Sequence, residues 1–180
     1  CRDWSSDVCS SDLAMTSPVL SSPSVARVRA ALAAAGHDTP IVELADAART
    51  AKAAAEFLGC SIAQIANSLV FRGQRSGLPL LVMASGSHRV DSVRLAALAG
   101  EPVEMARAPF VREHTGFAIG GVAPVGHPAP LKTLIDLALA KHARIWAAAG
   151  HPNTVFELSF EMLRSLTRGT PAELGESAPA

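Results

Sequence analysis

Two apolar runs near the centre of the chain constrain the fold more than any other feature. They are NSLVFRG, residues 67–73, and LPLLVMASG, residues 78–86, and the turn-like segment GQRSG joins them. Runs rich in branched apolar residues that flank a short loop with glycine are typical of a β-hairpin. The sequence therefore predicts a hairpin at which a central sheet begins.

Helices with polar N-caps and glycine stops are predicted on both sides of this hairpin. Apolar residues recur at helical spacing between Pro23 and Gly36. Thr50 is placed to cap a helix that ends at Gly59, and Asp91 to cap a helix that ends at Gly100. Further elements are expected as strands at 40–44, 131–136, 143–150 and 155–159, as a strand with a helical turn in 101–116, and as helices at 61–65, 137–142 and 160–166. This order predicts one α+β domain with a mixed sheet.

The composition bounds the class of protein. With 180 residues, of which 49% are hydrophobic and 18% charged, the chain can bury a core and is not expected to be disordered. Its formal net charge of zero excludes the strongly basic surface of many nucleic-acid binders, although a local basic face remains allowed. Charged residues interrupt the alanine-rich stretches, so no membrane span is expected. Three scattered cysteines are too few for a disulfide framework and fit a reducing compartment.

The two ends of the chain differ in composition from its centre. Residues 1–13, CRDWSSDVCSSDL, resemble translated adapter sequence, which makes Met15 the expected natural start. We expect residues 1–22 to be a non-native or disordered leader and residues 23–168 to form the folded domain. Residues 169–180 are rich in proline, glycine, glutamate and alanine and are expected to be a flexible tail.

Glycine and proline crowd residues 120–130 more densely than a chain reversal requires. Successive glycines allow backbone N–H groups to approach a ligand closely, as an oxyanion or phosphate site requires. The alternative interpretation is a tight turn that connects two strands. No Gly-Lys-Ser/Thr follows, so the segment is not a Walker phosphate loop.

Other chemistry-bearing residues give weaker signals. His127 and His151 each lie in a Gly-His-Pro triplet, which suits either a functional residue on a constrained loop or a structural histidine. Their spacing gives no metal-ligand pattern. The segment ASGSH lacks the glycine two residues before the serine of a nucleophile elbow, so Ser85 and Ser87 are expected to be turn residues.

Four segments together resemble the YbaK/aminoacyl-tRNA-synthetase-associated (prolyl-tRNA editing) domain family. They are QIANSLVFRG, LVMASGSHRVD, TGFAIGGVAPVGHP and RIWAAAGHPNTVFELSFEML, and the match runs from about residue 24 to 166. The resemblance implies a mixed, curved and barrel-like sheet flanked by helices, in a cytoplasmic protein. It also implies a trans-acting deacylase that hydrolyses the ester of mischarged tRNA, of the tRNA-Pro type, with positioned water.

The resemblance assigns roles to individual residues. The family's Gly-x-x-x-Pro motif falls on Gly120 and Pro124, which are expected to line the acyl pocket, with Gly121 beside them offering backbone N–H groups. Asn67 stands where many members carry a lysine that engages the substrate. Asn67 is expected to line the same pocket, and its alternative role is that of a turn residue before the strand.

The missing lysine leaves the source of positive charge open. Candidates for the substitute cation are Arg72, Arg89 and Lys132. His151 and Asn153 in GHPN resemble a His-Pro…Asn segment of the alanine-editing branch and are expected to contact substrate. No metal or organic cofactor is expected.

Alternatives to the deacylase stay open. The aminoacyl-tRNA acceptor end is the expected partner and prolyl-tRNA synthetase a candidate partner, with no membrane and no DNA involved. One rival function is a non-catalytic module that kept the fold and binds tRNA or a synthetase. Another is a hydrolase of small aminoacyl or thioester metabolites.

Overall fold

The computed structural model describes residues 17–45 and 50–176, so most of the expected leader lies outside the described residues. Residues 17–22 form turns ahead of the first helix. The helices are α1 (Pro23–Ala34), α2 (Ala51–Leu58), α3 (Ser92–Ala99), α4 (Ala108–Thr115) and α5 (Phe160–Thr167), with short 3-10 helices η1 (Ile62–Gln64) and η2 (Leu137–Lys141). The strands are β1 (Ile41–Glu43), β2 (Ile65–Gly73), β3 (Pro79–Ser85), β4 (Val103–Met105), β5 (Lys132–Asp136), β6 (Ile145–Ala148), β7 (Thr154–Leu158) and β8 (Thr170–Ala172).

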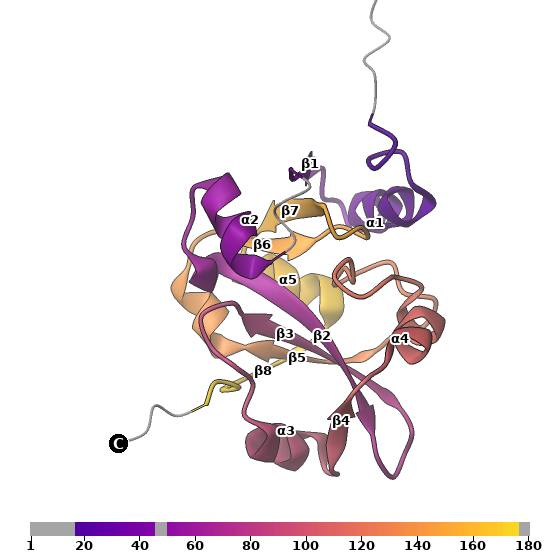
Figure 1. Cartoon of the computed structure of the whole chain (residues 1–180), viewed down its shortest axis with the longest axis vertical. Coiled ribbons are helices and arrows are strands. Elements are labelled where there is room, and N and C mark those ends of the chain that lie inside the picture. Colours follow the sequence, from indigo (N-terminus) through magenta and orange to yellow (C-terminus); the bar gives the residue numbers. More distant parts are fainter. Residues whose placement is uncertain (1–16, 46–49, 177–180) are drawn as a thin grey trace, which may run out of the picture.

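The strands form one mixed sheet in the order β1-β7-β6-β2-β3-β5-β8, with β4 paired to β2. The predicted hairpin is confirmed: β2 and β3 are antiparallel, and Asn67 lies opposite Ala84. Strand β2 pairs with β6 at its beginning and with β4 at its end. Consequently α1, β1 and β7 lie at one end of the molecule, and α3 and β4 lie at the other (Figure 1). The predicted α+β architecture with a mixed sheet is confirmed.

The caps read from the sequence form as expected. The Thr50 hydroxyl accepts the N–H of Ala53, and the Asp91 carboxylate accepts the N–H groups of Val93 and Arg94. These bonds satisfy donors that a helix N-terminus leaves free, each stabilising the helix by about 1 kcal/mol. Described helices of the protein are all too short or too polar to span a bilayer.

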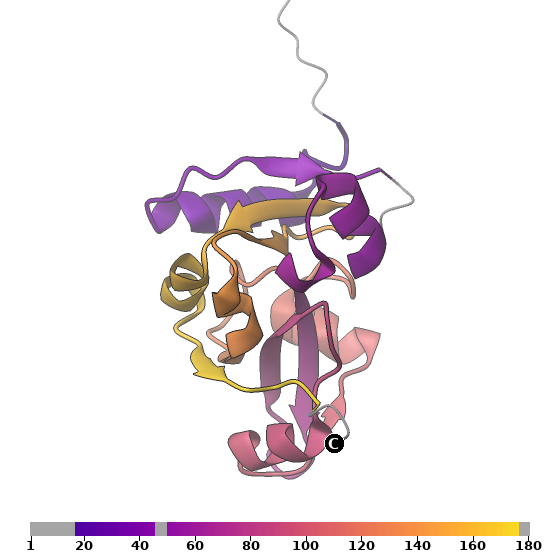
Figure 2. The same ribbon diagram turned by 90° about the vertical axis from the view of Figure 1, so that its left-hand side faces the viewer.

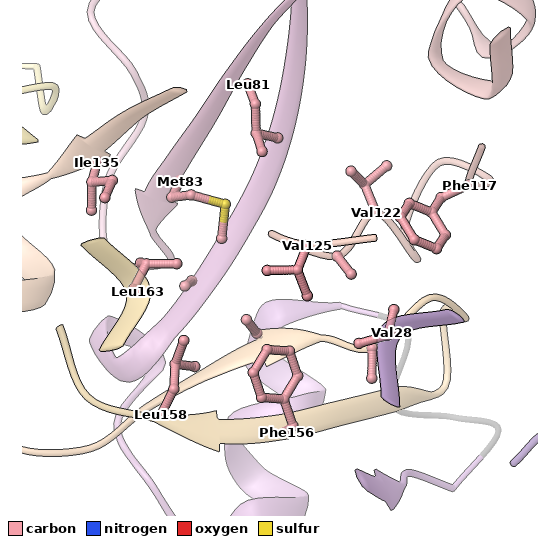
Figure 3. Close-up of a cluster of buried hydrophobic side chains, with 14 of the residues drawn as sticks. Val28, Leu81, Met83, Phe117, Val122, Val125, Ile135, Phe156, Leu158 and Leu163 are labelled. Carbon is pink, nitrogen blue, oxygen red and sulfur yellow. The ribbon is translucent and has the colours of Figure 1, made fainter. Parts of the chain in front are cut away.

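The main core holds the glycine-rich loop in place. Val28 of α1, Met83 of β3 and Phe156 of β7 are fully buried there (Figure 3). Phe117 and Val122, from the two ends of the segment that contains Gly120, point into the same cluster (Figure 3). Each buried side chain of this size contributes about 1.5–3 kcal/mol, so the loop is anchored on both sides of its glycines.

Residues 169–176 differ from the expected flexible tail. Residues 170–172 form β8, which extends the sheet beside β5 and runs along one side of the molecule (Figure 2). Ala172 and Leu174 are buried against β3 and α3, and Gly175 forms a bridge with Val90. The prediction was wrong here because it was based on the content of proline, glycine, glutamate and alanine. Ala172 and Leu174 are two residues apart, so both side chains point toward the core. Pro171 is tolerated because β8 is an edge strand.

Candidate functional site

A pocket of about 240 Å³ lies where several segments of the fold meet. Its wall includes the beginning of β2, the first half of α2, the glycine loop, part of β6, and the turn before β7 with the beginning of that strand. Apolar side chains such as Trp146 and Val155 form much of the surface, and the polar groups come from a few residues that include Thr50, Asn67 and Thr154. A mostly apolar cavity with a few convergent polar groups is typical of a small-molecule site.

Asn67 is the polar side chain best placed to meet a ligand in this pocket. It lies in β2 and is half-buried, and its amide makes no hydrogen bond with the described residues. An amide offers two N–H donors and one carbonyl acceptor, so it can bind a neutral or polarised group directly. The neighbouring Ser68 hydroxyl is instead directed to the Met83 sulfur at 3.4 Å.

The glycine loop lines the same pocket as Asn67. Gly120 has a φ of +88°, a conformation in which side chains are strained, and a Cβ at this position would lie 3.7 Å from the Pro152 ring. The Gly121 N–H donates to the Ala118 carbonyl at 3.0 Å, so it is not available to a ligand. Within the described ranges, the N–H groups of Gly120 and Val122 make no backbone hydrogen bond, and both residues line the pocket.

Comparison with known proteins places the chain among proteins that share this architecture. The profile of the aminoacyl-tRNA editing domain family matches residues 45–166, which include Asn67, Gly120 and the turn before β7. The chain belongs to this family. The resemblance read from the sequence is therefore confirmed.

Individual relatives agree with this assignment. A solved structure of a candidate trans-editing enzyme for prolyl-tRNA synthetase is 42% identical, with a TM-score of 0.82 over 87% of this chain and 99% of that chain. The uncharacterized protein YwhH of Bacillus subtilis is 30% identical over 140 residues, 78% of this chain and 82% of the relative. A candidate Cys-tRNA(Pro)/Cys-tRNA(Cys) deacylase of Enterococcus faecalis is 30% identical over 126 residues, 69% of this chain and 76% of the relative.

The editing domain does not bring all the predicted residues to the pocket. Pro124 is buried and faces a different depression, between the loop and helices α1 and α5. Arg72 lies five residues along β2 from Asn67, about 16 Å at the usual rise per residue, and it points to the other face. Its guanidinium lies over the Phe110 ring at 5.6 Å. Both residues were predicted to bind substrate, and the structure places neither in the pocket.

The other proposed cations are also elsewhere in the editing domain. The Lys132 ammonium donates to the Ala99 carbonyl at 3.2 Å, and Arg89 does not line the pocket. Among the described residues, no lysine or arginine lines it. The described part of the pocket wall therefore carries no charge.

His151 and Asn153 support the pocket wall from behind. The His151 Nδ1 accepts the N–H of Asn153 at 3.2 Å, and the Asn153 carbonyl accepts the N–H of Leu44 at 2.7 Å. A Cβ on Gly121 would approach the His151 backbone at 2.8 Å, so the turn and the glycine loop are packed together. The pocket residue of this turn is Pro152, between the two predicted ones.

Sequence reasoning missed Trp146, Thr50 as a wall residue, and Ile119. Trp146 is half-exposed on β6, between buried Ile145 and Ala147. An aromatic side chain on the less buried face of a strand is a signal that could have identified it, because such a position has no need of bulk for the core.

His127 of the first Gly-His-Pro triplet lies away from this pocket. Its ring packs edge-on against Phe117 with centroids 5.7 Å apart, and burial lowers its pKa below the ordinary value. It is therefore a neutral histidine of the loop's packing. The described residues contain no cluster of three metal-ligating side chains.

Proposed function

We propose that the chain is a trans-acting deacylase that hydrolyses the ester of mischarged tRNA, of the tRNA-Pro type. The observation that carries this proposal is that Asn67, Gly120 and Val122 line one pocket whose described wall carries no charge. Membership of the aminoacyl-tRNA editing family and the names of the two deacylase and trans-editing relatives support it.

The mechanism needs donors and a positioned water rather than a strong nucleophile. In this proposal the N–H groups of Gly120 and Val122, which make no backbone hydrogen bond with the described residues, donate to the ester carbonyl oxygen and stabilise its negative charge as water adds to the carbonyl carbon. The C–O bond to the ribose then breaks, and the ribose oxygen takes up the proton that the water loses. Preorganised donors of this kind each accelerate such a reaction by about 10²–10³.

Asn67 completes the arrangement as the orienting residue. Because its amide is neutral, it can hold the ester or a ribose hydroxyl but cannot form an ion pair with a phosphate. The terminal phosphates of the tRNA must then be held by cations outside the pocket or by a synthetase partner, for which prolyl-tRNA synthetase is our proposal. The site of action that fits this partner is the cytoplasm.

The wall of the pocket favours a small, uncharged amino acid side chain. Its apolar groups, among them Trp146 and Val155, offer no partner for a charge, and burying an unpaired charge is unfavourable. Larger apolar side chains would compete poorly in about 240 Å³, although each methylene changes the binding free energy by only about 1–3 kcal/mol.

The deciding experiment is a deacylation assay on a panel of mischarged tRNAs, with both the amino acid and the tRNA varied. We expect hydrolysis of small-side-chain esters on tRNA-Pro and much slower hydrolysis of charged ones. If the protein binds tRNA but hydrolyses none of the esters, the result would contradict the proposal that it is a deacylase.

One observation favours a second function, a module that binds the tRNA end without hydrolysis. By its resemblance to the family, Asn67 stands where many members carry a lysine, and no lysine or arginine of the described residues lines the pocket. This alternative predicts that the wild-type protein binds aminoacyl-tRNA without deacylating it. It also predicts that Asn67→Lys restores hydrolysis.

A further inference from the structure

A second polar cluster lies at the turn after β3, outside the pocket described above. The His88 Nε2 lies 2.6 Å from the Asp136 Oδ2, and the His88 Nδ1 lies 3.3 Å from the Ser87 Oγ. The sequence predicted only a turn here, but the fold brings Asp136 from the end of β5 to complete a serine, histidine and carboxylate chain. None of the three residues lines the editing pocket.

Asp136 is held rigidly. It is only 2% exposed, its Oδ2 also accepts the Ser85 N–H at 3.0 Å, and its Oδ1 accepts the Ala138 N–H at 3.0 Å. A carboxylate accepts hydrogen bonds, so the His88 Nε2 is the donor in the short bond between them. In the neutral imidazole this leaves the lone pair of Nδ1 facing Ser87. A base oriented in this way can activate a hydroxyl.

Two serines lie next to each other, and only Ser87 is accessible. The buried Ser85 hydroxyl donates to the Ala63 carbonyl at 2.9 Å, so it offers only a lone pair to the Ser87 Oγ, also at 2.9 Å. The Ser87 hydroxyl therefore lies between two acceptors, Ser85 Oγ and His88 Nδ1. Rotation about its C–O bond directs its proton to the imidazole.

The surroundings of the imidazole leave room for a small substrate. A depression of about 340 Å³ is lined by His88, Asp136, Leu174 and Lys141 among others, and Ser87 is exposed next to His88 in the chain, outside that wall. In the described part of the chain the backbone N–H of His88 makes no hydrogen bond. An N–H from the residue after the nucleophile is a usual oxyanion donor in serine hydrolases.

We propose that Ser87 is a nucleophile that accepts acyl groups from small activated esters, with His88 as its base and Asp136 as a positioning residue. The Ser87 Oγ forms a bond to the ester carbonyl carbon while its proton passes to His88 Nδ1. The bond from that carbon to the alkoxy oxygen breaks, and the leaving oxygen takes the proton from Nδ1. Water then hydrolyses the acyl-serine, which releases the carboxylic acid and returns the proton to Ser87.

The test uses p-nitrophenyl acetate as the probe and the full chain as the enzyme. We expect a burst of nitrophenolate and an acetyl group, detected by mass spectrometry, on the peptide that contains Ser87. Ser87→Ala should abolish that acetylation, whereas Ser92→Ala, which removes an exposed serine at the start of α3, should leave it unchanged. His88→Ala should slow the burst by about 10²-fold or more, since that is the usual contribution of a general base.

Asp136→Asn tests the positioning role separately from the stability of the fold. The amide favours the other imidazole tautomer, so the acylation rate should fall by about 10²-fold or more while KM for the ester is unchanged. Acetylation of lysines alone, or equal labelling of the peptide in wild type and Ser87→Ala, would overturn the proposal. Ser87→Ala should still deacylate mischarged tRNA, so the two activities are distinguishable.

Discussion

Asn67 and Gly120 reach one cavity from two different elements, a strand and a loop. Gly120 is required there because its φ of +88° is strained for any residue with a Cβ, while Asn67, in the wall of the same pocket, has no described hydrogen-bond partner. The role of Gly120 depends on its backbone conformation, and that of Asn67 depends on its side chain. Substitutions at the two positions can therefore be tested separately for effects on stability and on deacylation.

Gly120→Ala should lower both stability and deacylation. The left-handed conformation costs about 1–2 kcal/mol in an alanine, which shows in chemical denaturation, and relief of that strain would move the neighbouring N–H groups. Gly36→Ala is the matched control, since Gly36 has a φ of +79° and no atom near its would-be Cβ. It should lose similar stability but keep full deacylation. Equal deacylation by both variants would contradict a role for the loop in the reaction.

Asn67→Lys should add a phosphate contact at the edge of the pocket. A new contact of this kind steepens the dependence of log binding constant on log salt by about 0.7–0.9, which titrations of tRNA at several salt concentrations measure. A salt dependence identical to that of the wild type would show that residue 67 does not face the terminal nucleotide.

His127 should make the stability of the fold depend on pH. Burial holds its pKa below the unfolded value of about 6.5, so the unfolded chain binds the proton first as the pH falls. Its contribution is fully present above about pH 6.5 and is lost as the pH falls toward the folded-state pKa. Urea unfolding from pH 7 to 5 should show a smaller loss in His127→Gln than in wild type. An equal loss of unfolding free energy between pH 7 and 5 in wild type and His127→Gln would contradict the argument that burial lowers the pKa of His127.

At the scale of elements, local signals predicted most of the fold. Thr50, Asp91 and the two apolar runs act through neighbours within a few residues, and their helices and hairpin form as expected. Arg72 does not reach the pocket of Asn67 because strand rise and the alternation of faces separate the two residues. Asp136 reaches His88 only through the pairing of β3 with β5. Contacts of this kind depend on topology, which short sequence patterns do not encode.

Leu174, two residues after the end of β8, tests whether residues 169–176 belong to the folded domain. Leu174 is fully buried, so Leu174→Ala should destabilise the fold by about 2–5 kcal/mol in urea unfolding. Glu173→Ala is the control, because its exposed pair with Arg94 is expected to contribute about 0–1 kcal/mol. A neutral Leu174→Ala would restore the expectation of a flexible tail.

At the scale of the whole molecule, the two proposed sites lie on the same hairpin but use different chemistry. The editing pocket opens among β2, α2 and the glycine loop and has no described cation in its wall, whereas Ser87 follows β3 and depends on a buried carboxylate. A net charge of zero suits a protein that contacts only the end of a tRNA and leaves the rest to a partner.

The measurement that tests the central claim most directly compares Asn67→Ala with wild type in single-turnover deacylation of mischarged tRNA-Pro. Gln74→Ala is the matched control, since it removes an exposed amide from the distal turn of the same hairpin. We predict a rate at least about tenfold lower for Asn67→Ala, equivalent to one lost hydrogen bond to the substrate, and an unchanged rate for Gln74→Ala. Equal rates for wild type and Asn67→Ala would contradict the assignment of this pocket as the editing site.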